Sequence, residues 1–503
     1  MHTSLLHRFL AFIGAVSILA AHAIPGKPGT LDGTFFPTSP IGAGKVITSP
    51  GDGWENANGL ILRRDGKIVL AGECLFANNT TAYKFCAVRY LSNGSLDTTF
   101  GVNGKVSTEF LGRSASAVGI VEQIDERVIL GGPCSDSRGD AFCVLRYKQD
   151  GTLDESFGTG GMVSYVPAFY SNAQALTLQS DGKIVLAGWC NFQFCAQRYR
   201  SDGSVDVGFG FGGLISARFA GYTSSSVTSV VAQVDGRLIL AGDCFNGLSR
   251  DFCMLRYNAD GSPDTSFGIN GIVVKAVGNT DISRFAVVQQ PDKKIVVAGH
   301  CRDGTNDVFC ALRYGSDGLV DVSFGTNGWV KTTSAFGADR SQAVALQEDG
   351  KIVLAGYCYN GYLYDFCALR YRDDGSLDST FGVGGKIMTT MTGNNGLEQA
   401  RALAIQPDGK LLLAGVCANG QNYDFCALRY DGGPFGYKNC SLDIDGDGLV
   451  LATTDSLMHT RIALGITGPA VVNGITFRPT ATRNTWPLIR DYLVTQCGMS
   501  LVQ

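Results

Sequence analysis

The chain has 503 residues, including 66 glycines and 16 cysteines, and its formal net charge is −4 at pH 7. A slightly acidic chain does not attract phosphate backbones, and the sequence contains no basic block and no basic amphipathic helix. Nucleic acid and anionic membranes are therefore excluded as expected partners. The length is sufficient for several domains or for one large closed array of repeats.

Residues 1–23 have the pattern of a signal peptide. Arg8 closes a short polar start, residues 9–20 form an apolar run, and residues 21–23 (A-H-A) form a small-x-small cleavage signal. The apolar run is too short to span a bilayer, and no later stretch of the sequence reaches that length. We therefore expect an exported monomer without a membrane span, located outside the cell, at the cell surface or in the periplasm.

Residues 24–431 are dominated by one repeated unit. The pattern A-G-x-C (G-G-P-C in the second copy), a loop, and F-C-x-x-R-Y occurs seven times, and its first cysteines recur every 54 to 60 residues. In the copy at residues 341–390, an apolar run, an Asp-Gly turn, a second apolar run and two further extended segments indicate four short antiparallel strands. Seven such units predict an all-β fold, a seven-bladed β-propeller. A β-solenoid is the alternative, although its rungs are usually shorter.

The two ends of the array predict how it closes. The word G-x-L-D-x-x-F followed by G-K-V appears once too early, at residues 29–46, and is missing after the seventh F-C-x-x-R-Y. The array therefore begins with a fourth strand and ends with a third, and an open stack would leave both edges unpaired. We expect residues 44–48 to complete the last blade beside residues 425–430, so that the N-terminal strand closes the ring.

The paired cysteines of each unit predict disulfides. The spacing within a pair is five residues in one copy, nine in five copies and twelve in another. A metal site needs fixed ligand spacing, and a redox C-x-x-C motif needs two intervening residues. A bridge between cysteines that face each other across a hairpin tolerates variable loops, with residues 191–194 as a four-residue loop in the shortest copy. The expected bridges are Cys74–Cys86, Cys134–Cys143, Cys190–Cys195, Cys244–Cys253, Cys301–Cys310, Cys358–Cys367, Cys417–Cys426 and, outside the array, Cys440–Cys497.

Two polar residues also recur in the units. An arginine in R-Y and an aspartate in the L-D word occur seven times each at fixed offsets, which predicts a structural ion pair in every blade. In this interpretation Arg429 meets Asp32 across the closure of the ring. The alternative is a ring of carboxylates that binds a cation or a polar ligand in the channel.

One position of the unit differs in every copy. The x of A-G-x-C is a different residue each time, and a variable residue on a fixed frame is typical of a binding face. A strand end that tolerates any residue is the simpler interpretation. Trp189, His300 and Tyr357 are the candidates for a possible ligand face.

No catalytic residues can be assigned, because the sequence contains neither a G-x-S-x-G word nor a Walker A word. We therefore expect a secreted, non-enzymatic binding or scaffold protein whose partner is an unknown protein or glycan. The alternative is a secreted hydrolase or lyase that acts on glycans or peptides at a site on one propeller face.

The words D-G-K-I-V-L-A-G, L-R-Y and D-G-S-L-D-x-S-F-G-x-x-G-K-V resemble the bacterial delta-60 repeat family over residues 29–431. The resemblance implies a propeller of a secreted or surface protein and carries no catalytic assignment. The paired cysteines are an addition to the usual pattern, and they fit a secreted setting.

The character of the sequence changes at the linker of residues 432–439. In the module of residues 440–503, the segment 442–465 opens with D-x-D-x-D-G before a predicted helix, which is typical of a calcium loop. It resembles a dockerin-like or EF-hand-type loop, but position 12 is Thr454 and a second acidic loop is missing, because residues 485–494 read as a helix. The expected ligands of Ca²⁺ are Asp443, Asp445, Asp447, the carbonyl of Leu449, and Asp455 in the bidentate role.

Overall fold

The computed structural model describes residues 27–76, 82–136, 139–168, 170–276, 285–304, 306–334, 336–392, 396–433, 444–445, 451, 453–463, 466 and 468–495. The chain forms two compact units, and the boundary between them lies between Gly433 and Pro434. The larger unit holds the sheets and the smaller unit holds the helices. Each unit is described by itself.

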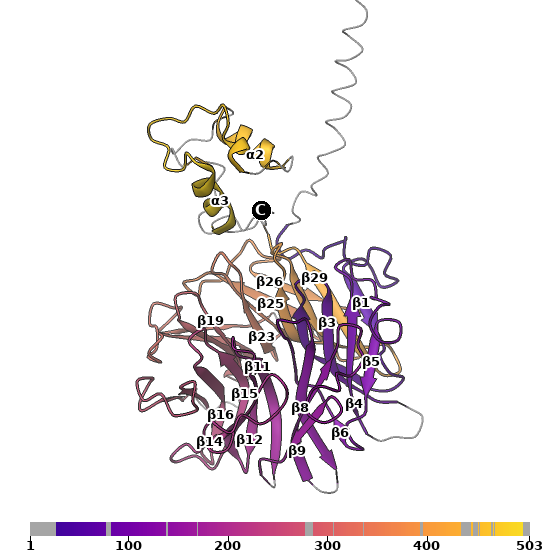
Figure 1. The fold of residues 1–503 in the computed structure, drawn as a ribbon. Coiled ribbons are helices and arrows are strands. Elements are labelled where there is room, and N and C mark those ends of the chain that lie inside the picture. The colour runs from indigo at the N-terminus through magenta and orange to yellow at the C-terminus, as the bar shows by residue number, and fades with distance from the viewer. Residues whose placement is uncertain are drawn as a thin grey trace, which may run out of the picture. The chain divides into compact units, whose positions relative to one another are not determined.

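The described residues of the larger unit form seven sheets arranged as the blades of a β-propeller (Figure 1). In blades 1 to 6 the strands follow one another in chain order, and in blade 2 the first strand is divided into two pieces. Blade 1 consists of β2 (Glu55–Leu62), β3 (Ile68–Cys74), β4 (Lys84–Tyr90) and β5 (Lys105–Thr108). Blade 2 consists of β6 (Ser114–Ala115), β7 (Gly119–Glu122), β8 (Val128–Asp136), β9 (Gly139–Tyr147) and β10 (Met162–Tyr165). Blade 3 consists of β11 (Ser171–Leu178), β12 (Ile184–Cys190), β13 (Gln193–Tyr199) and β14 (Leu214–Ala217).

The next three blades repeat this arrangement. Blade 4 consists of β15 (Ser224–Ala232), β16 (Leu238–Phe245), β17 (Arg250–Tyr257) and β18 (Ile272–Lys275). Blade 5 consists of β19 (Ala286–Gln289), β20 (Ile295–Asp303), β21 (Asn306–Tyr314) and β22 (Trp329–Thr332). Blade 6 consists of β23 (Arg340–Leu346), β24 (Ile352–Tyr359), β25 (Tyr364–Tyr371) and β26 (Lys386–Thr389).

Blade 7 combines strands from the two ends of the array. Its first three strands are β27 (Gln399–Ile405), β28 (Leu411–Ala418) and β29 (Tyr423–Tyr430), and its fourth is β1 (Lys45–Thr48). The antiparallel register runs from Lys45 opposite Leu428 to Thr48 opposite Phe425. The sequence predicted this pairing from the word that occurs once too early.

The core consists of apolar layers between successive blades, because the second and third strands of each blade are buried on both faces. One layer joins Val69 and Phe85 of blade 1 to Leu130 of blade 2. Another joins Leu412 of blade 7 to Leu70 of blade 1. This two-sided burial explains the continuous apolar word I-V-L-A-G.

All seven bridges expected within the propeller are present, with Cα–Cα distances of 5.7–6.0 Å. The sequence predicted that the two cysteines of a bridge face each other directly across the hairpin. They lie instead on a diagonal between the two strands. Cys190 faces Gln193, and Cys195 faces Gly188. The right-handed twist of paired strands shortens one diagonal and brings it within the reach of a disulfide.

The shortest hairpin is also tighter than predicted. Cys190 pairs with Gln193, so the loop consists of Asn191 and Phe192 alone and not of the four residues 191–194. Both loop residues have positive φ, 47° and 63°, as a two-residue type I′ turn requires. This turn matches the twist of the flanking strands.

A β-bulge explains the glycine of A-G-x-C. In blade 3 the register of β11 on β12 shifts between Ala173 and Ala175, so that Gln174 is the extra residue. Gly188 lies under this bulge, and a Cβ on it would lie 1.9 Å from the carbonyl oxygen of Asn172. The motif therefore needs a residue without a side chain at this point.

The smaller unit contains α2 (Asp455–Ala463), the 3-10 turn η1 (Gly468–Val471) and α3 (Trp486–Thr495). Its buried apolar side chains come from all three elements and include Met458, Val471 and Ile489. Within the described parts of the chain, no helix has the length and apolar character needed to cross a bilayer.

Candidate functional site

The recurring arginine and aspartate form an ion pair in every blade, which confirms the structural interpretation. The distances between Nε and Oδ2 are 2.7–2.9 Å for Arg89–Asp97, Arg146–Asp154, Arg198–Asp206, Arg256–Asp264, Arg313–Asp321, Arg370–Asp378 and Arg429–Asp32. The side chains are buried, and each guanidinium also lies over a phenylalanine ring, as Arg429 does over Phe35 at 4.6 Å. These aspartates are therefore occupied in holding the frame.

Each of these arginines also connects two blades. Arg146 donates from Nη1 to the carbonyl of Ser201, which belongs to the loop that follows the third strand of blade 3, at 2.6 Å. Arg256 does the same to the carbonyl of Ser316 at 2.6 Å. Because the pattern recurs around the propeller, each blade is hydrogen-bonded to the next by the same buried cation.

The ion pair at Asp32 makes the free energy of unfolding depend on pH in the acidic range. Burial raises the pKa of Asp32, but hydrogen bonds from Thr34 and Lys410 and the charge of Arg429 outweigh burial and lower it to about 2. A lowered folded-state pKa means that the contribution is present above about pH 4 and is lost as the pH falls through 2. We expect a loss of about 2 kcal/mol from this group in urea denaturation between pH 4 and pH 2.

The control for this pH dependence is Asp32→Asn. This variant should be less stable than the parent at pH 7, and the gap should close by pH 2. An unchanged gap at pH 2 would contradict the lowered pKa of Asp32.

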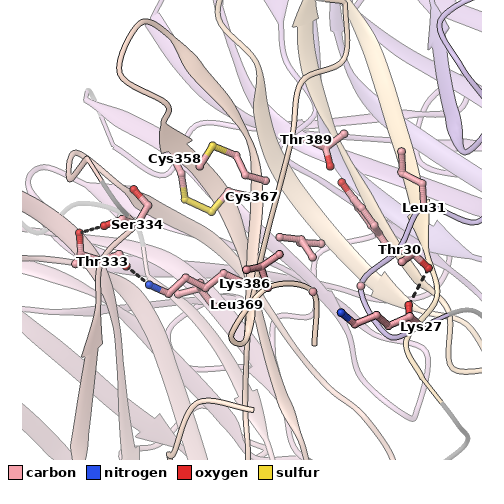
Figure 2. A pocket seen from close by; sticks show the side chains of 16 residues that line it. Lys27, Thr30, Leu31, Thr333, Ser334, Cys358, Cys367, Leu369, Lys386 and Thr389 are labelled. Carbon is pink, nitrogen blue, oxygen red and sulfur yellow. Dashed lines mark hydrogen bonds between the residues drawn. A yellow bond between two sulfur atoms is a disulfide. The ribbon is translucent and has the colours of Figure 1, made fainter. Parts of the chain in front are cut away.

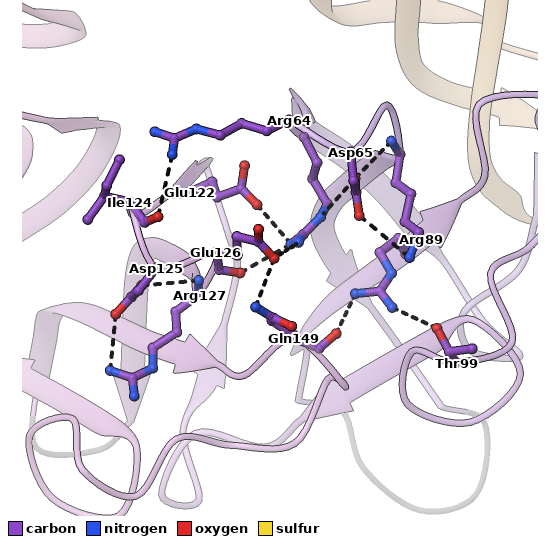
Figure 3. Close-up of polar contacts among 12 residues, drawn as sticks. Arg64, Asp65, Arg89, Thr99, Glu122, Ile124, Asp125, Glu126, Arg127 and Gln149 are labelled. Carbon is purple, nitrogen blue, oxygen red and sulfur yellow. Dashed lines mark hydrogen bonds and ion pairs between the residues drawn. The ribbon is translucent and has the colours of Figure 1, made fainter. Parts of the chain in front are cut away.

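One inter-blade ion pair departs from the repeat. Six units carry glutamine after the first strand, but blade 1 carries Arg63, and blade 2 carries Glu122 where other units are mostly apolar. Arg63 Nη1 lies 2.9 Å from Glu122 Oε1, and the two side chains are 3% and 11% exposed. Figure 3 shows the surrounding contacts, in which Glu126 and Asp65 also approach the guanidinium.

The contribution of the Arg63–Glu122 pair to stability can be tested by replacing both residues with the types that the other units carry. We expect Arg63→Gln alone to cost about 3 kcal/mol of unfolding free energy, because it leaves Glu122 buried without its cation. The double variant Arg63→Gln with Glu122→Leu should recover the loss or exceed the parent slightly. Thermal or urea denaturation of the three proteins measures this, and equal losses in the single and double variants would refute it.

One cavity of about 390 Å³ at the centre of the propeller is lined by the residue 16 positions before the first cysteine of every unit. This residue is the bulge residue in blades 1, 3, 4 and 7, and we call all seven the bulge residues. These residues are Asn58, Val118, Gln174, Thr228, Phe285, Gln342 and Arg401. Glu73 and Pro133, two of the variable residues in A-G-x-C, also line it. The cavity therefore gathers the parts of the unit that are not repeated.

The polar groups of the cavity are held in place by one another. Arg401 donates from Nη1 to Asn58 Oδ1 at 2.8 Å and from Nη2 to Gln399 Oε1 at 3.2 Å. Glu73 Oε1 accepts a hydrogen bond from Asn56 Nδ2 at 2.7 Å. A planar cation, a carboxylate and several amides thus line one partly open cavity, an arrangement suited to a polar ligand.

Sequence reasoning missed the bulge residues, although a signal for them exists. Each lies 16 residues before the first cysteine of its unit, and the residue type changes from copy to copy. A variable residue inside an otherwise apolar strand marks these positions.

The structure disperses the three candidates for a ligand face. Trp189 is partly exposed, whereas His300 and Tyr357 are only 2% and 7% exposed. Burial, together with the nearby charge of Arg340, lowers the pKa of His300 to about 4, so the imidazole is neutral at pH 7. A face formed by all three residues stays a prediction, and of them only Trp189 is partly exposed.

A second, apolar cavity of about 780 Å³ lies beside β26 (Figure 2). Leu31, Leu369 and Ile387 line it, together with the Cys358–Cys367 bridge. Residues 27–31 form one of its walls. Its shape therefore depends on the N-terminal segment being in place.

The expected calcium loop lies partly outside the described residues. Asp443, Asp447 and Leu449 fall there, as do Cys440 and Cys497, while Asp445 and Asp455 are described. Among the described residues, no cluster of three or more His, Cys, Asp or Glu side chains has the geometry of a metal site.

Asp455 organises the described part of this loop. Its Oδ1 accepts hydrogen bonds from the backbone N–H groups of Ile444 and Asp445 at 2.6 and 3.1 Å. Its Oδ2 accepts from the N–H of Leu451 and the hydroxyl of Thr454 at 2.9 and 3.0 Å. Burial raises the pKa of Asp455, but these hydrogen bonds outweigh it and lower the pKa. The carboxylate is therefore ionised and ties the loop to the start of α2.

The model of a family described as "Domain of unknown function (DUF5122) beta-propeller" matches residues 63–100, 179–209, 233–267, 290–324 and 347–381. The delta-60 repeat family, which the sequence words resemble, belongs to the same clan of families. No curated protein matches the chain in sequence.

Among solved structures, a protein of unknown function from Dyadobacter fermentans is 13% identical, with coverage of 77% of this chain and 97% of its own and a TM-score of 0.44. A virginiamycin B lyase from Staphylococcus aureus is 9% identical, with coverage of 76% and 98% and a TM-score of 0.43. A polysaccharide lyase described as an ulvan lyase is 9% identical, with coverage of 78% and 96% and a TM-score of 0.46.

Proposed function

We propose that this protein is a secreted, non-enzymatic binding protein that holds a small polar ligand in the central cavity of its propeller. The observation that carries the proposal is the contrast between the repeated structural residues of the blades and the variable residues that line the cavity. The ion pairs, bridges and glycines recur in the blades, whereas the seven bulge residues are of six different types and meet in one cavity of about 390 Å³. A rigid frame that carries variable residues is the usual construction of a binding site.

The lining suggests the class of ligand. The guanidinium of Arg401 presents a fork that matches a carboxylate, and the amides of Asn58, Gln174 and Gln342 can donate to and accept from hydroxyl groups. A small molecule that carries both a carboxylate and hydroxyls, such as a uronic acid, satisfies these groups.

Calorimetry with galacturonate and glucuronate tests the proposal. The parent protein should release or take up heat with at least one of them, and Arg401→Leu should weaken binding at least tenfold. Arg64→Ala, an exposed arginine on the same blade as Asn58, is the matched control and should bind like the parent. The absence of binding to the parent would reject this ligand class, and turnover of glycan or peptide substrates abolished by one substitution would favour the hydrolase or lyase alternative.

We also propose that the segment 443–455 binds Ca²⁺. The word D-x-D-x-D-G at residues 443–448 carries this proposal, and the hydrogen bonds of Asp455 hold the backbone of Ile444 and Leu451 next to the start of α2. Titration with Ca²⁺ should give heat that Asp445→Ala removes. Equal heats in the two proteins would refute the calcium site.

Export and closure complete the proposal. Seven disulfides among the described residues require an oxidising compartment, which supports cleavage of residues 1–23 as a signal peptide. The pairing of β1 with β29 supports a ring that the N-terminal strand closes in solution.

A further inference from the structure

Three aromatic side chains lie together at the cysteine end of blade 3. The rings of Trp189 and Phe192 are stacked, with centroids 5.8 Å apart and planes inclined by 8°. Tyr170 lies 6.1 Å from Phe192, and the side chains of Tyr170 and Phe192 are 52% and 54% exposed. We call these three residues the aromatic platform. It is outside the cavity described above.

The backbone under the aromatic platform is held in a conformation that a phenylalanine rarely adopts. Phe192 occupies the second position of a two-residue turn at φ 63°, next to Asn191 at φ 47°. Glycine is favoured at this position because a Cβ is crowded when φ is positive. The chain therefore keeps a large ring where folding alone favours the smallest residue. Strain of this kind at an exposed aromatic points to a role in binding.

Hydrogen bonds fix the aromatic platform on two sides. The N–H of Asn191 donates to the carbonyl of Tyr170 at 2.7 Å, and the N–H of Ser225 in blade 4 donates to the carbonyl of Phe192 at 2.8 Å. The Cys190–Cys195 bridge closes the same hairpin. The rings are thus presented on a rigid base, so little conformational entropy is lost when a ligand binds.

Two amide residues flank Phe192 in the chain. Asn191 is the first residue of the turn, and Gln193 opens β13 directly after it. An exposed aromatic face with amides beside it matches a sugar ring, whose C–H groups form one apolar face and whose hydroxyls point outward. A nucleobase would also stack, but the acidic net charge of the chain opposes its phosphates.

We propose that the aromatic platform binds a neutral pyranose unit of a polysaccharide, with the sugar ring stacked on the exposed Phe192 ring, which Trp189 supports from its other side. This site is separate from the cavity, and it would anchor the protein on a polymer while the cavity takes a small ligand. A substitution that removes binding at one site should leave binding at the other site unchanged.

Affinity electrophoresis in gels that contain hydroxyethyl cellulose, xylan or glucomannan tests the proposal. We expect at least one polymer to retard the parent protein. Phe192→Gly should lose at least nine-tenths of the retardation and yet unfold at the same or a higher temperature, because it removes the ring and also relieves the positive φ. A merely structural ring could not produce this combination.

Two further variants complete the test. Tyr362→Ala removes an aromatic residue that is 88% exposed in the corresponding hairpin of blade 6, and Arg401→Leu alters the cavity. Both should be retarded like the parent. The proposal is overturned if no polymer retards the parent, if Phe192→Gly is retarded as strongly, or if Tyr362→Ala loses retardation to the same degree. If Arg401→Leu is retarded like the parent, polymer binding does not depend on the cavity. A failure of the cavity to bind uronic acids would then leave this proposal unaffected.

Discussion

A chain from which residues 24–48 are deleted should fail to form a stable propeller. Such a chain lacks β1, so β29 loses its partner along Phe425–Leu428. It also lacks Asp32, which leaves the buried guanidinium of Arg429 without its carboxylate at 2.7 Å. An unpaired buried charge alone costs about 3–5 kcal/mol, and the exposed sheet edge adds a route to aggregation.

The loss should extend beyond one blade because the same segment closes several contacts. Phe35 is fully buried in the layer between blades 7 and 1, and the N–H of Gly29 donates to the carbonyl of Asp431 at 2.7 Å. The apolar cavity beside β26 would lose the wall that residues 27–31 provide. We therefore expect little secreted protein, and a melting temperature lowered by more than 10 °C for any that folds.

Two companion experiments make this result specific. A chain that ends at Gly433 keeps every strand of the propeller and should retain its melting temperature. A synthetic peptide of residues 27–48, added during refolding of the truncated chain, should restore part of the stability. A truncated chain as stable as the parent would show that the N-terminal strand does not close the ring.

Gly242→Ala should destabilise the propeller by about 3 kcal/mol or more, since overpacking against fixed backbone has no low-cost relaxation. The added Cβ would lie 1.9 Å from the carbonyl oxygen of Ser226 and 3.0 Å from the N–H nitrogen of Thr228. Both belong to the bulge of β15, between Val227 and Ser229. The strand must therefore move away, which breaks the bulge and displaces Thr228 from the cavity.

Blade 2 offers a matched control inside the same motif. Its word is G-G-P-C, so Gly131 stands where most other units have alanine. A Cβ on Gly131 would meet only the side chains of Leu176 and Leu186, at 3.2 Å or more. Gly131→Ala should therefore be neutral or stabilise by about 0.5 kcal/mol, because it reduces the freedom of the unfolded chain. Urea denaturation of both variants checks the pair, and similar losses would contradict the bulge explanation.

The regular features could be read from the residues because they are local and repeated. The offset of eight residues between Arg89 and Asp97 recurs in the next five copies, and one physical explanation, a buried ion pair, accounts for these and for the pair of Arg429 with Asp32. The variable spacing of the cysteines pointed to bridges across hairpins for the same reason. Each inference needed only neighbours within one blade.

Other features depended on geometry that no local pattern contains. The diagonal position of Cys190 and Cys195 follows from the twist of two strands, and the two-residue turn follows from that register. The burial of His300 and Tyr357 is a property of the folded chain, which residue type alone does not reveal. Variation between the copies drew attention to the x of A-G-x-C, and the equally variable bulge residues were overlooked.

The number of blades, the seven bridges of the propeller, the ion pairs and the pairing of the first strand with the last could be predicted from the residues, since each depends on words that recur at nearly constant intervals. Which variable residues meet became visible in the folded structure alone. Asn58 and Arg401 are far apart in the chain, yet Arg401 Nη1 lies 2.8 Å from Asn58 Oδ1, because the seven first strands surround one axis. Convergence of this kind depends on how blades are placed around the ring, and strand-forming patterns specify only how residues pair within a blade.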